Sequence, residues 1–375
     1  MSDPVLNIEP DAPETLQTTP LDALHRSLGA KLVPFAGYAM PVQYPAGVLA
    51  EHLHTRAAAS LFDVSHMGQF SLSGDRAAQV LEALTPGDFQ GLPEGRQRYT
   101  LLLNEAGGII DDLMVAHHPG RLVIVANASR KAVDAHHIAQ HLDGATLDQH
   151  PDRALLALQG PAVAAIMATL CPAAAALPFM GATIATIGGI TCWISRSGYT
   201  GEDGVEISVD GADAEALARL LLAQPGVAPA GLGARDSLRL EAGLCLYGAD
   251  IDAVTTPVEA GLTWAIAKRR RTEGGYPGAA VIADQLAHGP PRRRVGLVPS
   301  GRAPARAGTR IVAAGTDGGI VTSGGFSPTL GAPIAMGIVR RDLAALGGTV
   351  DLMIRGTAQP ATVVTLPFVP HRYAR

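Results

Sequence analysis

The stretch Tyr99–Val115, YTLLLNEAGGIIDDLMV, contains two β-like runs that are separated by the turn signal Glu105–Gly108 (EAGG). Val, Ile, Leu and Tyr are typical of strands, and glycine supplies the positive φ that tight turns need. The stretch therefore predicts a β-hairpin. Its second strand carries two adjacent acids, Asp111 and Asp112, among apolar residues.

The two acids occupy positions where a buried strand is normally apolar. Because side chains alternate between the two faces of a strand, Asp111 and Asp112 point in opposite directions and are not a same-face acid/base pair. We expect one to face solvent and the other to face a core or a pocket, where an acid is costly unless it is used. The alternative is that both lie at an exposed hairpin edge, where charge discourages pairing with other chains.

The composition is that of an ordered globular protein with more than one domain. The chain has 375 residues, of which 47% are hydrophobic and 17% charged, and this length allows two or three domains with sizeable cores. Its 43 glycines and 27 prolines exceed average usage and favour a turn-rich architecture that contains β-structure. A net charge of −5 gives no electrostatic reason to expect binding to nucleic acid or to a membrane surface.

Cysteine usage and the N-terminal residues indicate a compartment. Cys171, Cys192 and Cys245 form no C-x-x-C pair and are expected to be reduced, mostly buried thiols of a cytosolic protein. No apolar run reaches the roughly 18 residues that a membrane-spanning helix needs. Residues 1–17 contain four acids and no Lys or Arg, unlike a targeting leader. We expect a flexible acidic tail over residues 1–17 and a cytoplasmic location.

The pattern of elements changes near residues 272–292. Before this segment, helical and strand-like patterns alternate, with a loop expected at Phe35–Tyr44, a helix at Val48–Ser60 and a strand at Leu61–Leu72. After it, six short strands follow at regular spacing, which is typical of a small β-barrel or sandwich. We expect a larger α/β unit followed by a β unit.

Common cofactor, metal and nucleophile motifs are missing from the sequence. Gly231–Asp236 (GLGARD) begins like a dinucleotide fingerprint but lacks its last glycine and a convincing strand before it. There is no G-x-x-x-x-G-K-[ST] loop, no H-E-x-x-H and no Ser or Cys nucleophile motif. The adjacent histidines at 117–118 and at 136–137 diverge in direction, so we expect no metal site.

Two segments carry charges that suit a ligand or a partner. In Val205–Val209 (VEISV), period-two alternation places Glu206 on a polar strand face, where a fixed carboxylate suits an N–H/NH₂ edge such as that of an aminopyrimidinone ring. A solvent-facing glutamate is the alternative. Lys268–Arg271 (KRRR) is a basic run that is either a solvated face or a docking surface for an acidic partner.

Two arginines share one face of a predicted helix. Arg235 and Arg239 lie four residues apart, and their mutual repulsion predicts an anionic group nearby. That group is either a neighbouring acid, Asp236 or Glu241, or the carboxylate of a ligand.

Eight motifs, taken in chain order, closely resemble those of the aminomethyltransferase (T-protein) family of the glycine cleavage system. They are TPL (19–21), FAGYAMPVQY (35–44), FDVSHMGQ (62–69), NEAGGIIDDLMV (104–115), SGYTGEDGVEIS (197–208), GLGARDSLRLEAGL (231–244), KRRR (268–271) and TSGGFSPTLG (322–331). The resemblance spans roughly residue 18 to the C-terminus. It implies a multi-lobed α+β fold around a folate site, with two α/β lobes in a domain over residues 18–272 and a C-terminal β-barrel over residues 292–370.

The resemblance also implies a reaction and a partner. An aminomethyl group on the lipoyl arm of the H-protein would supply a methylene carbon to tetrahydrofolate, giving 5,10-methylenetetrahydrofolate and ammonia. KRRR would be a docking surface for an acidic H-protein. Two alternatives stay open: a folate-dependent demethylase of the same fold, and a non-catalytic folate-binding accessory protein. Accessory relatives of the kind linked to iron–sulfur maturation carry a cysteine in the turn that corresponds to Ser195–Asp203, and this chain has none there.

The site residues that the resemblance implies are spread over the whole chain. The family's catalytic aspartate corresponds to Asp112, the second acid of the pair. The family's FVP-containing tail corresponds to residues 368–373 (FVPHRY). This chain ends in HRYAR, which departs from the commoner ending of the family. The folate contacts correspond to Tyr99, Tyr199, Glu206 and Arg235, with Met40, Asn127 and Tyr373 as further pocket residues.

Overall fold

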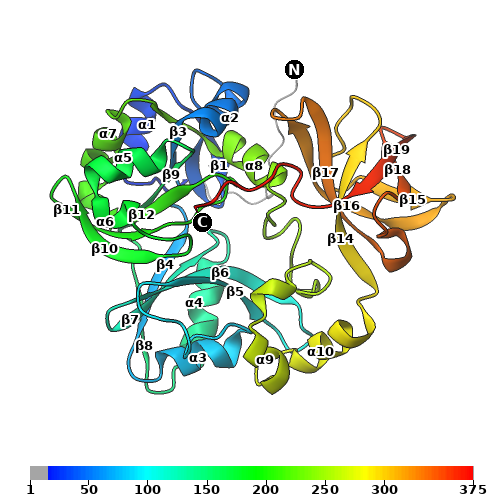
Figure 1. Cartoon of the computed structure of the whole chain (residues 1–375), viewed down its shortest axis with the longest axis horizontal. Helices are drawn as coiled ribbons and strands as arrows, with labels where there is room; N and C mark the ends of the chain where they lie inside the picture. The colour runs from blue at the N-terminus through cyan, green and yellow to red at the C-terminus, as the bar shows by residue number, and fades with distance from the viewer. Residues whose placement is uncertain (1–15, 375) are drawn as a thin grey trace.

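The computed structural model describes residues 16–374 and arranges them as three lobes that meet at the centre of the molecule (Figure 1). Most of the acidic tail expected over residues 1–17 lies outside the described residues. Gln17 is described, and its backbone hydrogen-bonds to that of Gly37 and Ala39. No helix within residues 16–374 is both long enough and apolar enough to span a bilayer.

The first lobe is built on a mixed six-stranded sheet. Its strands, in spatial order, are β10 (Ala182–Ile187), β11 (Ile190–Ser195), β12 (Gly204–Asp210), β9 (Arg153–Gln159), β3 (Ala59–Asp63) and β13 (Val227–Pro229). Only the β3–β13 pair of this sheet is parallel. The helices of this lobe are α1 (Asp22–Ser27), α5 (Val163–Leu170), α6 (Pro172–Ala175), η1 (Gly211–Asp213) and α7 (Ala214–Leu222).

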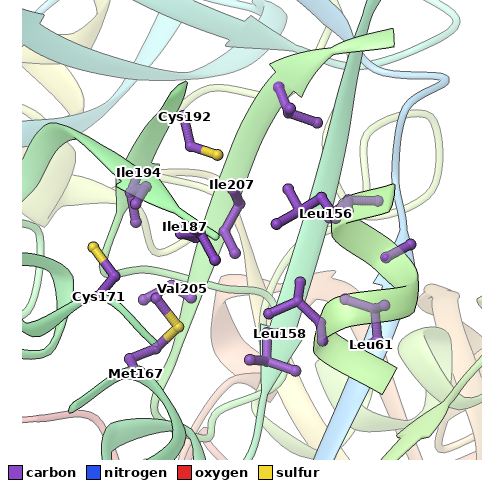
Figure 2. Packing of buried hydrophobic residues seen from close by; sticks show 14 of the residues in the cluster. Leu61, Leu156, Leu158, Met167, Cys171, Ile187, Cys192, Ile194, Val205 and Ile207 are labelled. Carbon is purple, nitrogen blue, oxygen red and sulfur yellow. The ribbon is translucent and has the colours of Figure 1, made fainter. Parts of the chain in front are cut away.

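The two faces of this sheet have different roles. One face packs on α1, α5, α6 and α7 through an apolar core, and Figure 2 shows Val205 and Ile207 of β12 within it. Because side chains alternate along β12, Glu206 lies on the opposite face. Helix α8 (Leu232–Glu241) covers part of that face with Ala234 and Leu238. The alternation read from VEISV therefore holds in the structure.

The second lobe is an antiparallel five-stranded sheet. Its strands, in spatial order, are β5 (Gln97–Leu103), β6 (Ile109–His118), β7 (Arg121–Ala126), β4 (Gly68–Ser73) and β8 (Thr146–Gln149). Helices α3 (Ala77–Leu84) and α4 (Lys131–Ala139) cover one face. Residues 245–282 pack against β5 and the start of β6. This segment runs through η2 (Thr263–Ala265) and α9 (Lys268–Glu273) into α10 (Ala279–His288).

The hairpin predicted from the NEAGG turn is confirmed as the β5–β6 pair. Gly107 has a φ of +78°, as the turn requires. Gly108 is needed for space, because a Cβ atom there would lie 1.9 Å from the Ala253 carbonyl oxygen. The side chain of Asn104 accepts hydrogen bonds from the backbone N–H groups of Ala106 and Gly108, both at 3.0 Å. The glycine half of the turn is therefore buried, whereas Glu105 and Ala106 are exposed.

Two predictions about the N-terminal third were wrong. Leu61–Leu72, expected to be one strand, contains β3 and β4, which belong to different sheets because a turn closes between them, with Met67 N donating to Val64 O (3.0 Å). Phe35–Tyr44, expected to be a loop, contains β2 (Tyr38–Gln43), which pairs with β1 (Lys31–Phe35). Prolines suggested the loop, but a two-stranded ribbon tolerates them at its edges. Helix α2 (Val48–Ala57) ends slightly before its predicted end.

The third lobe is a closed six-stranded barrel. The spacing of the strands predicted a barrel or a sandwich, and the family resemblance implied the barrel. Its strands, in order around the barrel, are β14 (Arg292–Pro299), β17 (Ala332–Arg340), β16 (Thr316–Ser327), β15 (Arg310–Ala313), β18 (Thr349–Ile354) and β19 (Thr357–Val364), with η3 (Arg341–Leu343) after β17. The chain then returns to the first lobe, as the red segment in Figure 1 shows. There Arg372 N donates to Gly201 O (2.7 Å).

Polar contacts hold the barrel against the first lobe. Thr322 and Ser323 of β16 both donate to Asp250, at 2.5 and 2.8 Å, and Arg239 of α8 donates to Ser323 at 2.9 Å. Two of these residues open the TSGGFSPTLG motif. That motif therefore contributes to the junction between lobes.

Candidate active site

A cavity of about 720 Å³ lies where the three lobes meet. This volume is within the range of pockets that enclose a small-molecule ligand. Met40 does not line the cavity, because its side chain is fully buried in β2, where it pairs with Val33. The other predicted site residues all line it, namely Tyr99, Asp112, Asn127, Tyr199, Glu206, Arg235 and Tyr373.

The adjacent acids of β6 point to opposite faces of the sheet, as predicted, but neither faces open solvent. Asp111 is fully buried on the face that α4 covers, and Asp112 lines the cavity on the other face. The expectation of one solvent-facing acid was wrong because helices pack over the Asp111 side. The edge-strand alternative is also wrong, since β6 pairs with β5 and β7 on its two sides.

Asn127, directly after β7, connects the two acids. Its Nδ2 donates to Asp111 Oδ1 at 2.9 Å and to Asp112 Oδ1 at 2.6 Å, and its backbone N–H donates to Asp111 Oδ2 at 3.0 Å. The Tyr99 hydroxyl donates to Asp112 from the neighbouring strand β5. Asp112 is thereby held in one orientation toward the cavity.

A third acid, Asp134 in the first turn of α4, completes this group. Burial and the charge of Asp111 raise the pKa of Asp134 to about 10. Burial, with a further contribution from Asp111, raises the pKa of Asp112 to about 7, although hydrogen bonds from Asn127 and Tyr99 oppose the shift. A carboxyl group with a pKa near neutrality can both hold and release a proton under working conditions, which is the property that a general acid or base needs.

The first lobe and α8 provide the opposite wall of the cavity. Glu206 Oε2 accepts from Ser197 Oγ at 3.3 Å, and burial raises the pKa of Glu206 while the charge of Arg235 opposes this shift. The Arg235 guanidinium lies 4.8 Å from the centre of the Tyr199 ring. Its Nη1 atom is buried and has no hydrogen-bond partner. This wall offers a carboxylate acceptor and an unused N–H donor to a bound ring.

The two arginines of α8 have separate roles. Arg239 is paired with Asp236 at 2.8 Å and with Asp250 at 2.7 Å, so the neighbouring-acid alternative is correct for this residue. Arg235 has no such ion pair within residues 16–374 and lines the cavity instead. Glu241, the other proposed acid, is paired with Arg56.

The C-terminal tail brings Tyr373 to the cavity. Its ring stacks on Phe179, with 4.3 Å between ring centres and 9° between planes. His371 Nε2 donates to the Ala242 carbonyl oxygen at 2.8 Å. Burial raises the pKa of Tyr373 to about 12, so its hydroxyl stays protonated. Although the tail departs from the commoner ending, Tyr373 lies within the site.

Three further residues of the cavity were not predicted from the sequence. His66 is buried and its Nδ1 has no hydrogen-bond partner; burial and the charges of Arg235 and Lys131 lower its pKa to about 4, against the effect of Asp63. Trp264 stacks against Tyr99 with 5.0 Å between ring centres, and Phe179 supports Tyr373. His66 lies in FDVSHMGQ, but no local pattern distinguished it from a core histidine.

The basic run KRRR is only partly exposed, with Lys268 and Arg271 at the surface. Arg269 pairs with Glu82 at 2.7 Å and with Asp88 at 2.9 Å, and Arg270 is only 6% exposed and donates to the Glu82 carbonyl oxygen. These contacts fasten α9 to the end of α3 and the loop that follows. Docking of an acidic partner on this run stays a prediction that falls to the exposed Lys268 and Arg271, because intramolecular acceptors already bind Arg269 and Arg270.

Acidic residues gather in the site, but they do not form a metal-binding set. Among residues 16–374, no three His, Cys, Asp or Glu side chains are grouped so that they could hold a metal ion.

Comparisons with known proteins agree with the resemblance seen in the motifs. The family described as "GCVT N-terminal domain" matches residues 21–270, and "Glycine cleavage T-protein C-terminal barrel domain" matches residues 292–370. A mitochondrial aminomethyltransferase of Gallus gallus is 48% identical over 374 residues, covering 96% of this chain and 95% of that protein. Its counterpart in Dictyostelium discoideum is 44% identical over 380 residues, covering 96% and 94%.

The fold comparison gives the same result. The crystal structure of the glycine cleavage system aminomethyltransferase T from Bartonella henselae superposes with a TM-score of 0.91 at 43% sequence identity, covering 96% of this chain and all of that one. The fold and both family matches thus agree, and this chain belongs to the glycine cleavage T-protein family of aminomethyltransferases.

Proposed function

We propose that this aminomethyltransferase of the glycine cleavage system carries out its reaction in the central cavity. Tetrahydrofolate would be the acceptor, and the aminomethyl group on the lipoyl arm of the H-protein would be the donor. One observation carries the proposal: a single cavity contains the near-neutral carboxyl group of Asp112, the Glu206 carboxylate and the unpartnered N–H of Arg235. These groups suit a flat heterocycle that bears amines beside its reacting atoms.

The transfer requires two new bonds and two broken bonds at one carbon. The methylene carbon forms bonds to N5 and N10 of tetrahydrofolate and loses its bonds to the amine nitrogen and to the lipoyl sulfur. N5 and N10 each give up one proton, and the leaving amine and the thiol each gain one. The products are 5,10-methylenetetrahydrofolate, ammonia and the dihydrolipoyl H-protein.

Asp112 is the residue that we assign to these proton transfers. Its carboxylate would hydrogen-bond the N5/N10 region and stabilise the positive charge that develops when an amine attacks the carbon. Asn127 and Tyr99 hold this carboxylate in place and oppose its protonation. A pKa of about 7 lets Asp112 accept a proton from an amine and return it within one turnover.

The opposite wall would bind and orient the pterin ring. Glu206 can accept two hydrogen bonds from an N–H/NH₂ edge, and Arg235 can donate its free N–H to a ring carbonyl. Tyr199 would support the ring, since its hydroxyl is anchored to the Cys245 carbonyl oxygen at 2.5 Å. Tyr373 would close the side of the cavity nearest the tail. Such enclosure orients the amine and shields the reacting carbon from water.

The test is product formation from purified components. Aminomethyl-loaded H-protein, tetrahydrofolate and this protein should yield methylenetetrahydrofolate and ammonia in equal amounts, and H-protein without its lipoyl group should yield neither. Glu206→Gln should raise the KM for tetrahydrofolate about tenfold, because it replaces one charged acceptor with an amide. Glu215→Gln on the exposed face of α7 is the matched control. Tight folate binding without turnover would contradict the proposal.

We also propose a cytoplasmic location for this reaction. Cys171, Cys192 and Cys245 are all buried and unpaired, which supports a reducing compartment. Fractionation of cells that produce the protein, with detection by antibody, tests this proposal.

A further inference from the structure

Asp111 lies directly behind Asp112 and has no part in the proton transfers assigned to that residue. Its side chain is fully buried on the helix-covered face of the second sheet. Both of its carboxylate oxygens accept from one residue: Oδ1 from Asn127 Nδ2 at 2.9 Å, and Oδ2 from the Asn127 backbone N–H at 3.0 Å. The same Nδ2 donates to Asp112 Oδ1 at 2.6 Å. One amide nitrogen thus serves an acid on each face of β6.

This pair of contacts needs an ionised carboxylate at position 111. The two Asn127 donors meet two different oxygens, and only a carboxylate offers an acceptor to each of them. An amide at this position would turn its NH₂ group toward one of the donors. The proton held by the neighbouring acids therefore belongs to Asp134 of α4, because burial and the charge of Asp111 raise the pKa of Asp134 to about 10.

Few groups near Asp112 can donate to its carboxylate. The titratable side chains around it are those of Tyr99, Tyr199, Cys245, Asp111 and Asp134. Within residues 16–374, Tyr99 is the only one of these that donates to Asp112, since the Tyr199 hydroxyl donates to the Cys245 carbonyl oxygen. The other donor is the Asn127 amide. The orientation of that amide therefore decides how Asp112 is solvated.

An asparagine amide can rotate by half a turn and exchange its N–H groups for its carbonyl oxygen. When Asp112 is protonated, its new O–H is a donor, and a free amide would turn its oxygen toward that O–H. The turn would also place the amide oxygen against the charged Asp111 carboxylate, which is 2.9 Å from the Asn127 nitrogen. Asp111 therefore opposes the rotation whether or not Asp112 carries a proton.

Resting on the proposed function, we propose that Asp111 is a positioning residue of the transfer, which fixes the Asn127 amide so that an N–H group meets Asp112 throughout the turnover. The amide then favours the ionised form of Asp112 at every step. Asp112 can accept a proton from the attacking amine and release it again, because no neighbour turns to stabilise the carboxylic acid.

The kinetic test is a double-mutant cycle between Asp111 and Asn127. Asp111→Asn should lower kcat about 10- to 100-fold and leave the dissociation constant for tetrahydrofolate within about threefold of the wild-type value. Asn127→Ala should lower kcat to a similar extent. Because Asp111 acts through Asn127, adding Asp111→Asn to Asn127→Ala should change kcat by less than about threefold. Full kcat in Asp111→Asn, or losses that multiply in the double variant, would overturn the proposal.

Glu82 provides a matched control in the same lobe. It accepts from the backbone N–H and from Nε2 of Gln90, at 2.8 and 2.7 Å, so it holds its partner much as Asp111 holds Asn127. Neither Glu82 nor Gln90 lines the central cavity. Glu82→Gln should lower the urea midpoint, as Asp111→Asn should, but keep the wild-type kcat. Equal kcat losses in these two variants would assign the effect to lost stability and reject the positioning role.

A second measurement needs neither substrate nor turnover. The chain contains three asparagines, so isotope labelling of asparagine alone gives three side-chain amide signals in NMR spectra, and Asn127→Ala identifies that of Asn127. In the wild type these amide protons should exchange slowly with solvent on both sides of the Asp112 pKa of about 7. In Asp111→Asn the exchange should become about tenfold faster. Fast exchange in the wild type would overturn the proposal even if a variant failed to fold, whereas slow exchange without turnover would reject only the proposed function.

Discussion

The buried carboxylates around Glu241 and those around Asp112 differ in how many hydrogen-bond donors surround them. Around Glu241, which links the first lobe to the barrel, donors are plentiful: Arg56 Nη2 at 2.8 Å, Thr329 Oγ1 at 2.7 Å, Ser327 Oγ at 2.5 Å and His52 Nε2 at 3.1 Å. Burial alone would raise the pKa of Glu241, but the interactions with His52, Ser327 and Thr329 lower it to about 2.

Around Asp112, by contrast, hydrogen-bond donors are too few for the carboxyl groups. Asp111 and Asp112 share the side-chain donor of Asn127, Tyr99 contacts Asp112 alone, and neither oxygen of the nearby Asp134 has a hydrogen-bond partner with the required geometry. Burial and mutual repulsion raise the pKa values instead of lowering them.

The comparison distinguishes buried acids that stabilise the fold from buried acids that can take part in chemistry. A buried acid with a full set of donors stays ionised at every working pH and holds lobes together. A buried acid with too few donors stays near its protonation midpoint and is available for chemistry, at a cost to stability. The predictions below test this distinction.

The largest effect is expected for Asp112→Asn. The amide keeps the shape and can still contact Asn127, but it cannot accept a proton, so kcat should fall by about 10²- to 10⁴-fold. The dissociation constant for tetrahydrofolate should stay within about threefold of the wild-type value. Steady-state kinetics and calorimetry measure the two quantities. Full activity in this variant would remove Asp112 from the proton transfers.

Glu241→Ala should instead damage folding. Removing the acid leaves Arg56 with one of its two carboxylate partners and leaves His52 without one, which should cost about 3–5 kcal/mol of the free energy of unfolding. Urea denaturation measures this loss. Asp284→Ala, which breaks an exposed pair with His288, is the control and should leave the midpoint unchanged. If Glu241→Ala kept its stability but lost kcat, the structural assignment would be wrong.

Asp134→Asn should stabilise the protein at alkaline pH. The folded pKa of about 10 lies above the ordinary value near 4, so folding takes up a proton between these limits and wild-type stability falls as pH rises through this window. Asparagine needs no proton, and its amide N–H groups offer a donor beside Asp111. We expect a gain of about 1–3 kcal/mol at pH 9 and almost none at pH 4. Equal urea midpoints for the two proteins at pH 9 would contradict the assigned protonation.

The smallest effect is expected for Arg269→Ala. Its partners Glu82, Asp88 and Glu273 are intramolecular, so the half-saturating concentration of H-protein should change by less than about twofold. Only a modest loss of thermal stability should accompany it, because this side chain lies near the surface. A large rise in the H-protein requirement would instead show that Arg269 contributes to docking.

Local patterns predicted much of the architecture. The β5–β6 hairpin follows from the NEAGG turn, and the direction of Glu206 follows from alternation along β12. Six regularly spaced strands predicted a barrel or a sandwich, and the family resemblance chose the barrel. These features depend on residues that are near one another in sequence, where φ preferences and side-chain periodicity act directly. Leu61–Leu72 was read as one strand because both halves are apolar, and apolarity does not reveal a change of sheet.

The surroundings of single side chains could not be predicted in this way. Asp134 lies 22 or 23 positions from the acids that it affects, Arg269 meets Glu82 across 187 positions, and nothing local distinguished His66 from a core histidine. Burial and charge at each of these residues depend on which distant element packs over it.

By itself the sequence determined the types of element, the order of the lobes and the residues with the chemistry for a folate reaction, because these depend on local conformational preference and on motif. Only the tertiary structure decided that Asp111 points into a helix-covered core while Asp112 faces the cavity, and that Arg239 is neutralised while Arg235 is left free. It also decided that Arg269 and Arg270 fasten α9 to the end of α3. The physical reason is that desolvation and pairing are set by neighbours that the chain brings together only when it folds.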